Sequence, residues 1–144
     1  MGHWEVPQDA GSARTYFVNG WHTEVEGGAD ASYRWSTSMV ARLLLPNAEG
    51  DRLELTLDCI PYVRLPEVQH QDVWIFASGI QCGFMRLENS QTINMLIPST
   101  ARTGSTLGIT FVLPNAARPS AFDSSSDERQ LGVALRSVAL DWDR

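Results

Sequence analysis

One short stretch, residues 20–36 (GWHTEVEGGADASYRWS), gathers most of the side chains that could do chemistry. His22 and Glu24 alternate along the chain, so an extended backbone would place both on one face and Trp21 on the other. An exposed histidine and carboxylate can act as general base and acid, or they can bind a metal ion. Two ligands are too few for a zinc site, and no third histidine or cysteine stands at ligand spacing. We therefore predict a polar corner, with no metal and no cofactor.

The aromatic residues of the same stretch suggest a sugar-binding surface. Sugars stack their apolar C–H faces on aromatic rings while neighbouring polar groups bond their hydroxyls, and small-ligand sites combine apolar walls with a few polar groups in this way. The alternative is that Trp21 and Trp35 are core residues, because large aromatic side chains dominate the cores of β-sandwiches. We expect at least one of these two tryptophans in the core. The candidate ligand-binding residues are Trp21, His22, Tyr33, Arg34 and Trp35.

A second cluster, DSSSDERQLG at residues 123–132, has part of a calcium-loop spacing. Asp123, Ser125 and Asp127 match the first, third and fifth positions of an EF-hand loop. The match then fails, because the sixth position is not glycine and the twelfth is not glutamate. An EF-hand is excluded, and a looser structural calcium stays open as an alternative. We expect the serines and Asp127 to cap loop backbone groups, and Arg129 to pair with an acid.

Nucleophilic catalysis lacks the residues that it requires. The chain has no G-x-S-x-G elbow, no histidine beside Cys59 or Cys82, and no glycine-rich loop that opens a helix. Cys59 continues the alternation that begins at Leu53, so we expect it to point into the core as a small hydrophobic residue. A single bridge between neighbouring strands is the alternative for the two cysteines.

Composition limits the partners that this chain can have. The formal net charge is −6, and all 11 basic residues are arginines. An acidic chain argues against nucleic acid, which binds a basic stripe, and against an anionic membrane surface. No apolar run approaches the length of a membrane-spanning helix, and the N-terminus lacks a basic region followed by an apolar one. We therefore expect no membrane insertion and no signal peptide, which predicts a cytoplasmic location.

The elements that must position these residues are β-strands. A hydrophobic content of 43% in 144 residues suits a globular domain. We expect a flexible lead-in over residues 1–14 and a single domain over residues 15–144. Short runs of period two end at Gly, Pro, Asn or Asp, which is typical of an antiparallel sandwich. We predict an all-β fold: a two-sheet, jelly-roll-like antiparallel β-sandwich with eight or nine strands.

Two pairs of these runs predict hairpins. The runs at residues 36–46 and 51–59 flank the turn sequence LPNAEGD, so we expect them to pair with each other. The runs at residues 72–79 and 81–89 flank a tight turn around a Ser-Gly dipeptide.

The end of the chain combines a long loop with a final strand. Residues 114–130 show no strand pattern, and unstructured loops of this length are usually functional or mobile. In the run at residues 131–142 the hydrophobic phase slips near residues 136–137, which predicts a β-bulge. A helix is the alternative for that run.

Separated motifs of this chain resemble those of a bacterial β-sandwich family. Residues 20–36, followed by an apolar strand, are similar to its opening signature, and SSSDERQLGVALRSVAL at residues 124–140 is similar to its closing signature. Residues 72–87 resemble its central hairpin, with Ala-Ser-Gly where Asn-Gly is usual. The likeness covers roughly residues 17–142. Domains of this family resemble carbohydrate-binding modules, and they are attached to bacterial glycosyltransferases and to other proteins that build cell-surface polysaccharide.

The resemblance implies a structural brace of Glu24, Asp127 and Arg129. Its acids and arginines lie at opposite ends of the chain, and the first and last strands of a sandwich commonly pair. We expect an ion pair between Glu24 and Arg129, or between Arg34 and Asp127. Bidentate pairs of this kind fix geometry more than they stabilise a protein. The resemblance marks these positions: Gly20, Trp21, Glu24, Arg34, Trp35, Asp127, Arg129, Leu131 and Gly132.

These observations predict a non-catalytic carbohydrate-binding or accessory module of a bacterial glycosyltransferase or surface-polysaccharide assembly protein. Its expected partners are a glycan and a neighbouring catalytic domain of a larger protein, and nucleic acid is excluded. The first alternative is a small glycan-acting hydrolase or lyase that uses His22 and Glu24, or Asp127. The second alternative is a purely structural interaction domain.

Overall fold

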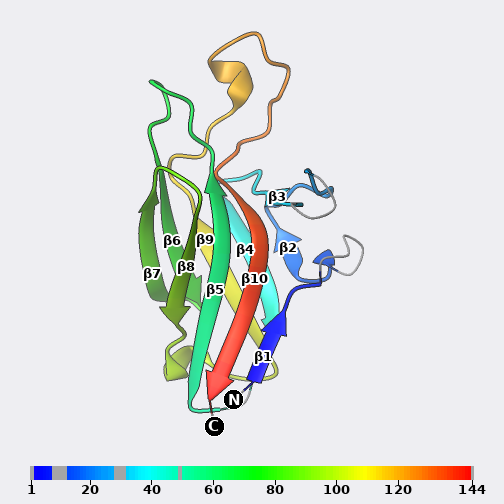
Figure 1. Ribbon diagram of the computed structural model, residues 1–144, viewed down its shortest axis with the longest axis vertical. Coiled ribbons are helices and arrows are strands. Elements are labelled where there is room, and N and C mark those ends of the chain that lie inside the picture. The colour runs from blue at the N-terminus through cyan, green and yellow to red at the C-terminus, as the bar shows by residue number, and fades with distance from the viewer. Residues whose placement is uncertain (1, 8–12, 28–31, 49, 144) are drawn as a thin grey trace.

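Two five-stranded antiparallel sheets face each other in the computed structural model, which describes residues 2–7, 13–27, 32–48 and 50–143 (Figure 1). The loop end of the sandwich, where β5 ends and β10 begins, lies opposite the end that carries both termini (Figure 1). Sheet A contains β1 (Gly2–Glu5), β3 (Arg34–Trp35), β5 (Arg52–Pro61), β8 (Gln91–Leu96) and β10 (Val133–Asp143). Sheet B contains β2 (Phe17–Asn19), β4 (Val40–Pro46), β6 (Gln71–Ala77), β7 (Ile80–Leu87) and β9 (Thr106–Val112). Short 3-10 turns, η1 (Ser99–Ala101) and η2 (Pro119–Ala121), lie in the connections.

This architecture confirms the predicted all-β, two-sheet sandwich. The described residues form ten strands rather than eight or nine. The additional strand is β1, which lies within the expected flexible lead-in and pairs antiparallel with residues 139–142 of β10. β3 pairs with residues 134–135 of the same strand, so β1 and β3 share one edge of β10. A run of four residues carries too short a pattern to reveal a strand whose partner lies at the other end of the chain.

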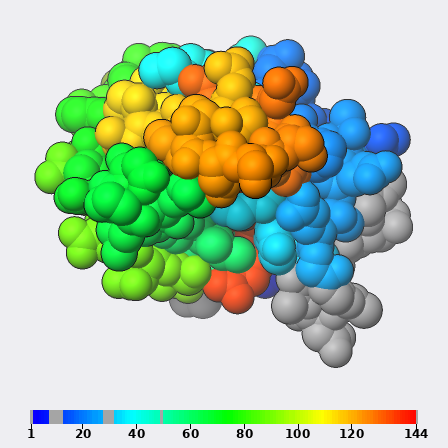
Figure 2. Space-filling view, turned by 90° about the horizontal axis from the view of Figure 1, so that it is seen from above, coloured from blue at the N-terminus to red at the C-terminus, as the bar shows by residue number. Residues whose placement is uncertain are grey.

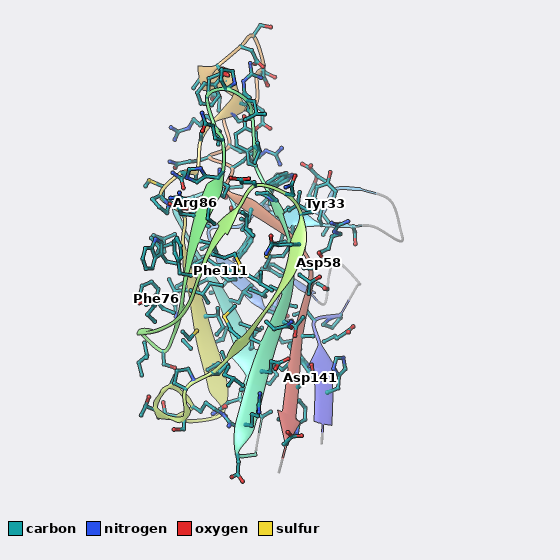
Figure 3. The ribbon with its side chains drawn as sticks, turned by 60° about the vertical axis from the view of Figure 1, so that its left-hand side comes forward. Tyr33, Asp58, Phe76, Arg86, Phe111 and Asp141 are labelled. Carbon is teal, nitrogen blue, oxygen red and sulfur yellow. The ribbon has the colours of Figure 1, made fainter. Side chains whose placement is uncertain are left out.

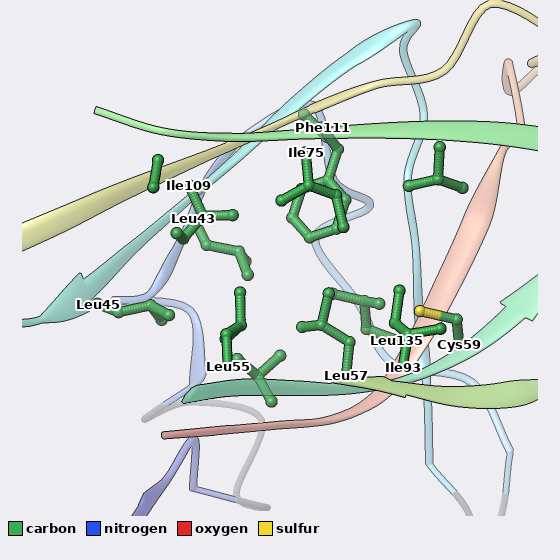
Figure 4. Close-up of a cluster of buried hydrophobic side chains, with 14 of the residues drawn as sticks. Leu43, Leu45, Leu55, Leu57, Cys59, Ile75, Ile93, Ile109, Phe111 and Leu135 are labelled. Atoms are coloured by element: carbon green, nitrogen blue, oxygen red, sulfur yellow. The ribbon is translucent and has the colours of Figure 1, made fainter. Parts of the chain in front are cut away.

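Every second residue of the strands points inward, and these apolar side chains fill the space between the sheets (Figure 4). The inward residues of β5, from Leu53 to Cys59, are at most 1% exposed, which confirms their predicted orientation. Complete burial of a leucine stabilises the fold by about 1.5–3 kcal/mol. The inward side chains of β5 therefore contribute much of the free energy that holds the two sheets together. Side chains of sheet B meet them across the core: Leu43, Leu45, Ile75, Ile109 and Phe111.

The predicted hairpin of β4 and β5 is wrong. β4 pairs with β2 and β9 in sheet B, whereas β5 pairs with β8 and β10 in sheet A. The connection between them crosses from one sheet to the other, and Arg102 supports it by donating to the carbonyls of Ala48 and Gly50. Each strand is apolar on one face only. Opposite sheets let these apolar faces meet, whereas a flat hairpin would place both faces on the same side of one sheet.

The other local predictions are confirmed. β6 and β7 form a hairpin that closes at residues 78–79. The final run is a strand, and its register shifts between Leu135 and Ser137. The shift moves the inward positions from the odd-numbered Val133 to the even-numbered Val138, so both halves of β10 bury their apolar side chains.

Cys59 and Cys82 are free thiols, so the disulfide alternative is wrong. Burial raises the pKa of Cys59 to about 12, and burial also raises the pKa of the half-buried Cys82. Because the thiolate is the reactive form, we expect DTNB at about pH 8 to leave Cys59 untouched and to modify Cys82 slowly in the folded protein. Thiol counting should find at most one reactive group before unfolding and both after it. Rapid modification of both native thiols would contradict this placement.

Candidate functional site

Trp21 is half-buried and packs against the hydrophobic core. Its ring packs edge-on against Phe17 and Phe111, with ring centroids 5.1 and 5.6 Å away. Its indole N–H donates to the carbonyl of Arg42 at 2.9 Å. Trp21 is therefore the tryptophan of this segment that packs against the core, and its side chain stays partly exposed.

Arg34 is buried, with only 2% of its surface exposed. Its Nη1 donates to the carbonyl of His22 at 2.7 Å, and its guanidinium lies 5.0 Å from the centroid of the Phe17 ring. Burial lowers the pKa of Arg34. The guanidinium therefore holds the segment from inside through the His22 carbonyl.

The two glycines that the resemblance marks are sites of close approach. Gly20 has a φ of +81°, and a Cβ there would lie 2.3 Å from the carbonyl oxygen of Val40. A Cβ on Gly132 would lie 2.9 Å from Leu113 Cδ1 and 3.1 Å from Ser36 Oγ. The same hydroxyl of Ser36 accepts the Gly132 N–H at 3.2 Å. Gly20 therefore allows the opening segment to lie close against β4, and Gly132 allows the residue before β10 to lie close to Ser36, so the role of both is architectural.

Tyr33 and Trp35 lie on the outer face of sheet A, where they form an aromatic row with Tyr62. The ring centroids of Tyr33 and Trp35 are 6.1 Å apart, and those of Trp35 and Tyr62 are 6.4 Å apart, both edge-to-face. The three rings are half-buried. Trp35 stands opposite Ala134 of β10, which pairs in turn with Ile60 of β5. The aromatic row (Tyr33, Trp35 and Tyr62) therefore spans three neighbouring strands at the loop end.

An arginine shared by two carboxylates borders the aromatic row. Arg129 donates to both carboxylate oxygens of Asp127, at 2.9 and 2.8 Å, and through Nη1 to Glu26 Oε1 at 2.7 Å. Glu26 forms a β-bridge with Tyr33, so the cluster lies next to the row. The cluster joins the long loop (residues 114–130) to the segment that carries the aromatic residues.

Neither of the two expected ion pairs forms, and a brace of different membership stands in their place. Asp127 and Arg129 take part, but Glu26 supplies the second carboxylate, and Glu24 is exposed. Arg34 bonds a backbone carbonyl in place of Asp127. Glu24 and Glu26 have the same parity along the chain, so the sequence pattern cannot decide which of them meets the arginine.

The brace determines the protonation state of Asp127. Hydrogen bonds from Arg129 hold the pKa of Asp127 below its usual range, although partial burial acts in the opposite direction, and the nearby His22 lowers it further. The same bonds raise the pKa of Arg129. An ionised, engaged carboxylate can accept a bond from a hydroxyl, but it is poorly suited to donate a proton as a general acid. This finding counts against a hydrolase that uses Asp127.

Asp127→Asn is expected to lower stability at pH 7 by about 1 kcal/mol, because it weakens a partly buried charge-assisted pair. A depressed folded-state pKa means that the carboxylate stabilises the fold above its unfolded pKa of about 3.9, and that this contribution disappears as pH falls through the folded pKa. The difference in melting temperature between the two proteins should therefore shrink from pH 7 to about pH 3. A difference that stays constant over this range would show that the brace is not the cause.

The loop around Asp123 is capped by its own side chains, as expected. Asp123 Oδ1 accepts the Ser125 N–H at 2.6 Å, and Ser125 Oγ accepts the Asp127 N–H at 3.1 Å. In residues 2–7, 13–27, 32–48 and 50–143, no three His, Cys, Asp or Glu side chains converge to hold a metal ion. Over the same ranges, no helix has the length and apolar character that a membrane crossing needs.

A second aromatic surface lies on the outer face of sheet B. Trp74 and Phe84 pair across β6 and β7 with ring centroids 4.3 Å apart, and they are 37% and 43% exposed. Figure 3 shows Phe76 and Arg86 on this side of the molecule, whereas Tyr33 lies on the opposite side. We call this surface the sheet-B face (Trp74, Phe76 and Phe84). The protein therefore presents aromatic rings on both outer faces.

Sequence reasoning missed Tyr62 and Glu26. A signal for Tyr62 was present, because it has the parity of Asp58 and Ile60, opposite to the inward residues of β5. Its partner Trp35 could not be found in the same way, because β3 and β5 become neighbours only through β10.

No family model and no curated protein matches this sequence. Solved structures are similar over the whole fold. One is the CBM36-1 domain of a multidomain xylanase from the hindgut metagenome of Trinervitermes trinervoides, with a TM-score of 0.55, 10% identity and 99% coverage of both chains. Another is the C-terminal CBM6 of LamC, a marine laminarinase from Zobellia galactanivorans, with a TM-score of 0.55 and 7% identity, covering 96% of this chain and 98% of that one.

A larger enzyme contains a similar unit. A family GH115 4-O-methyl-α-glucuronidase with specificity for decorated arabinogalactans has a TM-score of 0.57 and 12% identity. The match covers 99% of this chain and 18% of the glucuronidase. At these identities the likeness concerns the fold, and this chain has the β-sandwich fold of carbohydrate-binding modules.

Proposed function

We propose that this chain is a non-catalytic module that binds a glycan across the aromatic row. The observation that carries the proposal is the row itself: three half-buried rings, held by edge-to-face packing, at the loop end of sheet A. Rings held in this way can stack on the apolar face of a sugar, and the bordering brace supplies acceptors and donors for hydroxyl groups. The fold shared with carbohydrate-binding modules supports the same reading.

The charges beside the row favour a neutral glycan. Arg129 is shared by Glu26 and Asp127, so these three groups together carry one net negative charge when ionised. The whole chain has a formal charge of −6, which acts in the same direction. Uronic acids and sulfated sugars would be repelled by this field.

We also propose that the module serves a catalytic neighbour. The motif resemblance points to a bacterial glycosyltransferase or another protein of surface-polysaccharide assembly as the parent. A unit with the same fold makes up 18% of a glucuronidase, which supports this kind of arrangement. An accessory module of this type would keep the catalytic domain close to its glycan.

The proposal is tested by a glycan array of neutral and acidic polysaccharides that includes xylan, laminarin and arabinogalactan, followed by calorimetry on each positive sugar. We expect saturable binding to a neutral glycan, little changed between about 50 and about 500 mM NaCl, and no binding to polyuronates. Trp35→Ala should weaken this binding. Its matched control is Trp74→Ala, which removes an exposed tryptophan from the sheet-B face. A silent array, or binding confined to acidic glycans, would contradict the proposal.

A second candidate function is contact with a neighbouring domain through the sheet-B face. The exposed Trp74–Phe84 pair favours it, because exposed apolar patches on soluble domains often mark interaction sites. If Trp74→Ala loses glycan binding and Trp35→Ala keeps it, the glycan-binding site lies on the sheet-B face. Loss of binding in Trp35→Ala alone would leave that face available for a protein neighbour.

A further inference from the structure

A cleft opens at the loop end between residues 62–70 and the long loop. Its volume is about 300 Å³, at the lower limit of small-ligand sites. Val68, Ala117 and Phe122 form its apolar wall. Figure 2 views this end from above and shows residues 62–70, in green, directly against the long loop, in orange.

The two walls of the cleft are joined by hydrogen bonds. Gln71 is fully buried, and its Nε2 donates to the carbonyls of Tyr62 and Asn115 at 2.9 and 3.3 Å. Arg64 and Val68 exchange backbone hydrogen bonds of 2.8 and 2.7 Å, which close the other wall on itself. A cleft built in this way is preorganised, so a ligand would bind with little loss of loop entropy.

The polar groups of the cleft suit sugar hydroxyls. Asn115 Oδ1 accepts the Asp72 N–H at 2.8 Å, so its Nδ2 is the part of this amide that can donate to a bound hydroxyl. Glu67 and His70 add a carboxylate and an imidazole to the lining. A hydroxyl group both donates and accepts, and this mixture of groups can satisfy it in either role.

The charges in and beside the cleft again favour a neutral sugar. Arg64 donates through Nη1 to Asp123 Oδ2 at 2.7 Å, and its Nε lies 3.5 Å from Glu67 Oε2. Its guanidinium also lies 5.8 Å from the centroid of the Phe122 ring. Two carboxylates share this one arginine, so the three groups together carry one net negative charge. An anionic sugar would be repelled here, as it would be at the aromatic row.

We propose that this cleft is a second sugar subsite, and that the module therefore binds an extended neutral chain rather than a single terminal sugar. The inference rests on the proposed function. Tyr62 links the two places, because its ring contacts Trp35 of the aromatic row and its carbonyl is held by Gln71 in the cleft wall. Burial raises the pKa of Tyr62, and the charge of Arg64 acts in the opposite direction.

The test is calorimetry with xylohexaose and laminarihexaose, each compared with its disaccharide. The unaltered protein is expected to bind one hexasaccharide at least about tenfold more tightly than the disaccharide. Phe122→Ala should remove about tenfold of the hexasaccharide affinity and leave the disaccharide affinity within about twofold. Phe84→Ala, which removes an exposed ring from the sheet-B face, is the matched control and should change neither affinity.

The outcomes separate this subsite from the proposed function. Equal hexasaccharide affinities in the unaltered protein and in Phe122→Ala overturn the subsite, whereas unchanged binding in Trp35→Ala overturns the aromatic row. If the unaltered protein binds neither hexasaccharide nor any other neutral glycan of the array, both proposals fail. A second measurement does not depend on a variant: NMR signals of the His70 ring should shift when the bound hexasaccharide is added. The absence of a shift at saturation would also overturn the subsite.

Discussion

Replacing Phe111 by alanine is expected to lower the free energy of unfolding by about 3–5 kcal/mol. The Phe111 side chain is completely buried, and it lies on β9, which pairs with β4 on one side and β6 on the other. Its side chain lies beside that of Ile75, its neighbour on β6 (Figure 4). Its ring also packs edge-on against the ring of Trp21. A central strand held on both sides cannot collapse into the vacated space, so the cavity cost adds to the lost transfer free energy. For a domain with a stability of about 5–15 kcal/mol, this is a large fraction.

Urea denaturation followed by tryptophan fluorescence measures this effect through the midpoint, provided that the slope stays unchanged. Phe84→Ala is the matched control, because it deletes the same side chain from a position that is 43% exposed. That variant should differ from the unaltered protein by about 1 kcal/mol or less. Similar losses of stability in the two variants would contradict the tight packing of Phe111 between the sheets.

Replacing Trp35 by alanine is expected to weaken glycan binding about thirtyfold, which corresponds to about 2 kcal/mol. Trp35 is the middle ring of the aromatic row, and it contacts both Tyr33 and Tyr62. Its removal takes away the largest stacking surface and also leaves the two tyrosines without the ring that orients them. The probe is whichever neutral glycan the array identifies, and calorimetry gives the dissociation constant directly.

Two further variants make the Trp35 result specific. Trp35→Phe keeps a ring in the row, so it should recover part of the affinity that Trp35→Ala loses. Trp74→Ala deletes a tryptophan of the sheet-B face and should leave the affinity unchanged. Circular dichroism and thermal unfolding must show that each variant is folded. A folded Trp35→Ala protein with full affinity would remove the aromatic row from the proposed function.

The alternation of apolar and polar residues, together with turn sequences, was enough to predict much of the local structure. The alternation from Leu53 to Cys59 identified the inward side of β5, and the phase slip near residues 136–137 identified the bulge of β10. The Ser-Gly turn identified the hairpin of β6 and β7. These features depend on neighbours in the chain, because the side chains of a strand alternate faces whatever strand lies beside it.

Strand partners required the tertiary structure. The patterns of β4 and β5 are compatible with one sheet or with two, and only packing of their apolar faces against each other placed them in opposite sheets. β1 was hidden for the same reason, since its four residues pair with the other end of the chain.

The sequence by itself determined that this protein is an all-β sandwich and that residues 20–36 carry unusual aromatic and charged side chains. The tertiary structure decided what each of them does. It packed Trp21 against the core, buried Arg34, paired Arg129 with Glu26, and placed Tyr62 beside Trp35. The physical reason is range: parity and turn chemistry act between adjacent residues, whereas a binding surface is made by strands that meet only after the sheets have formed.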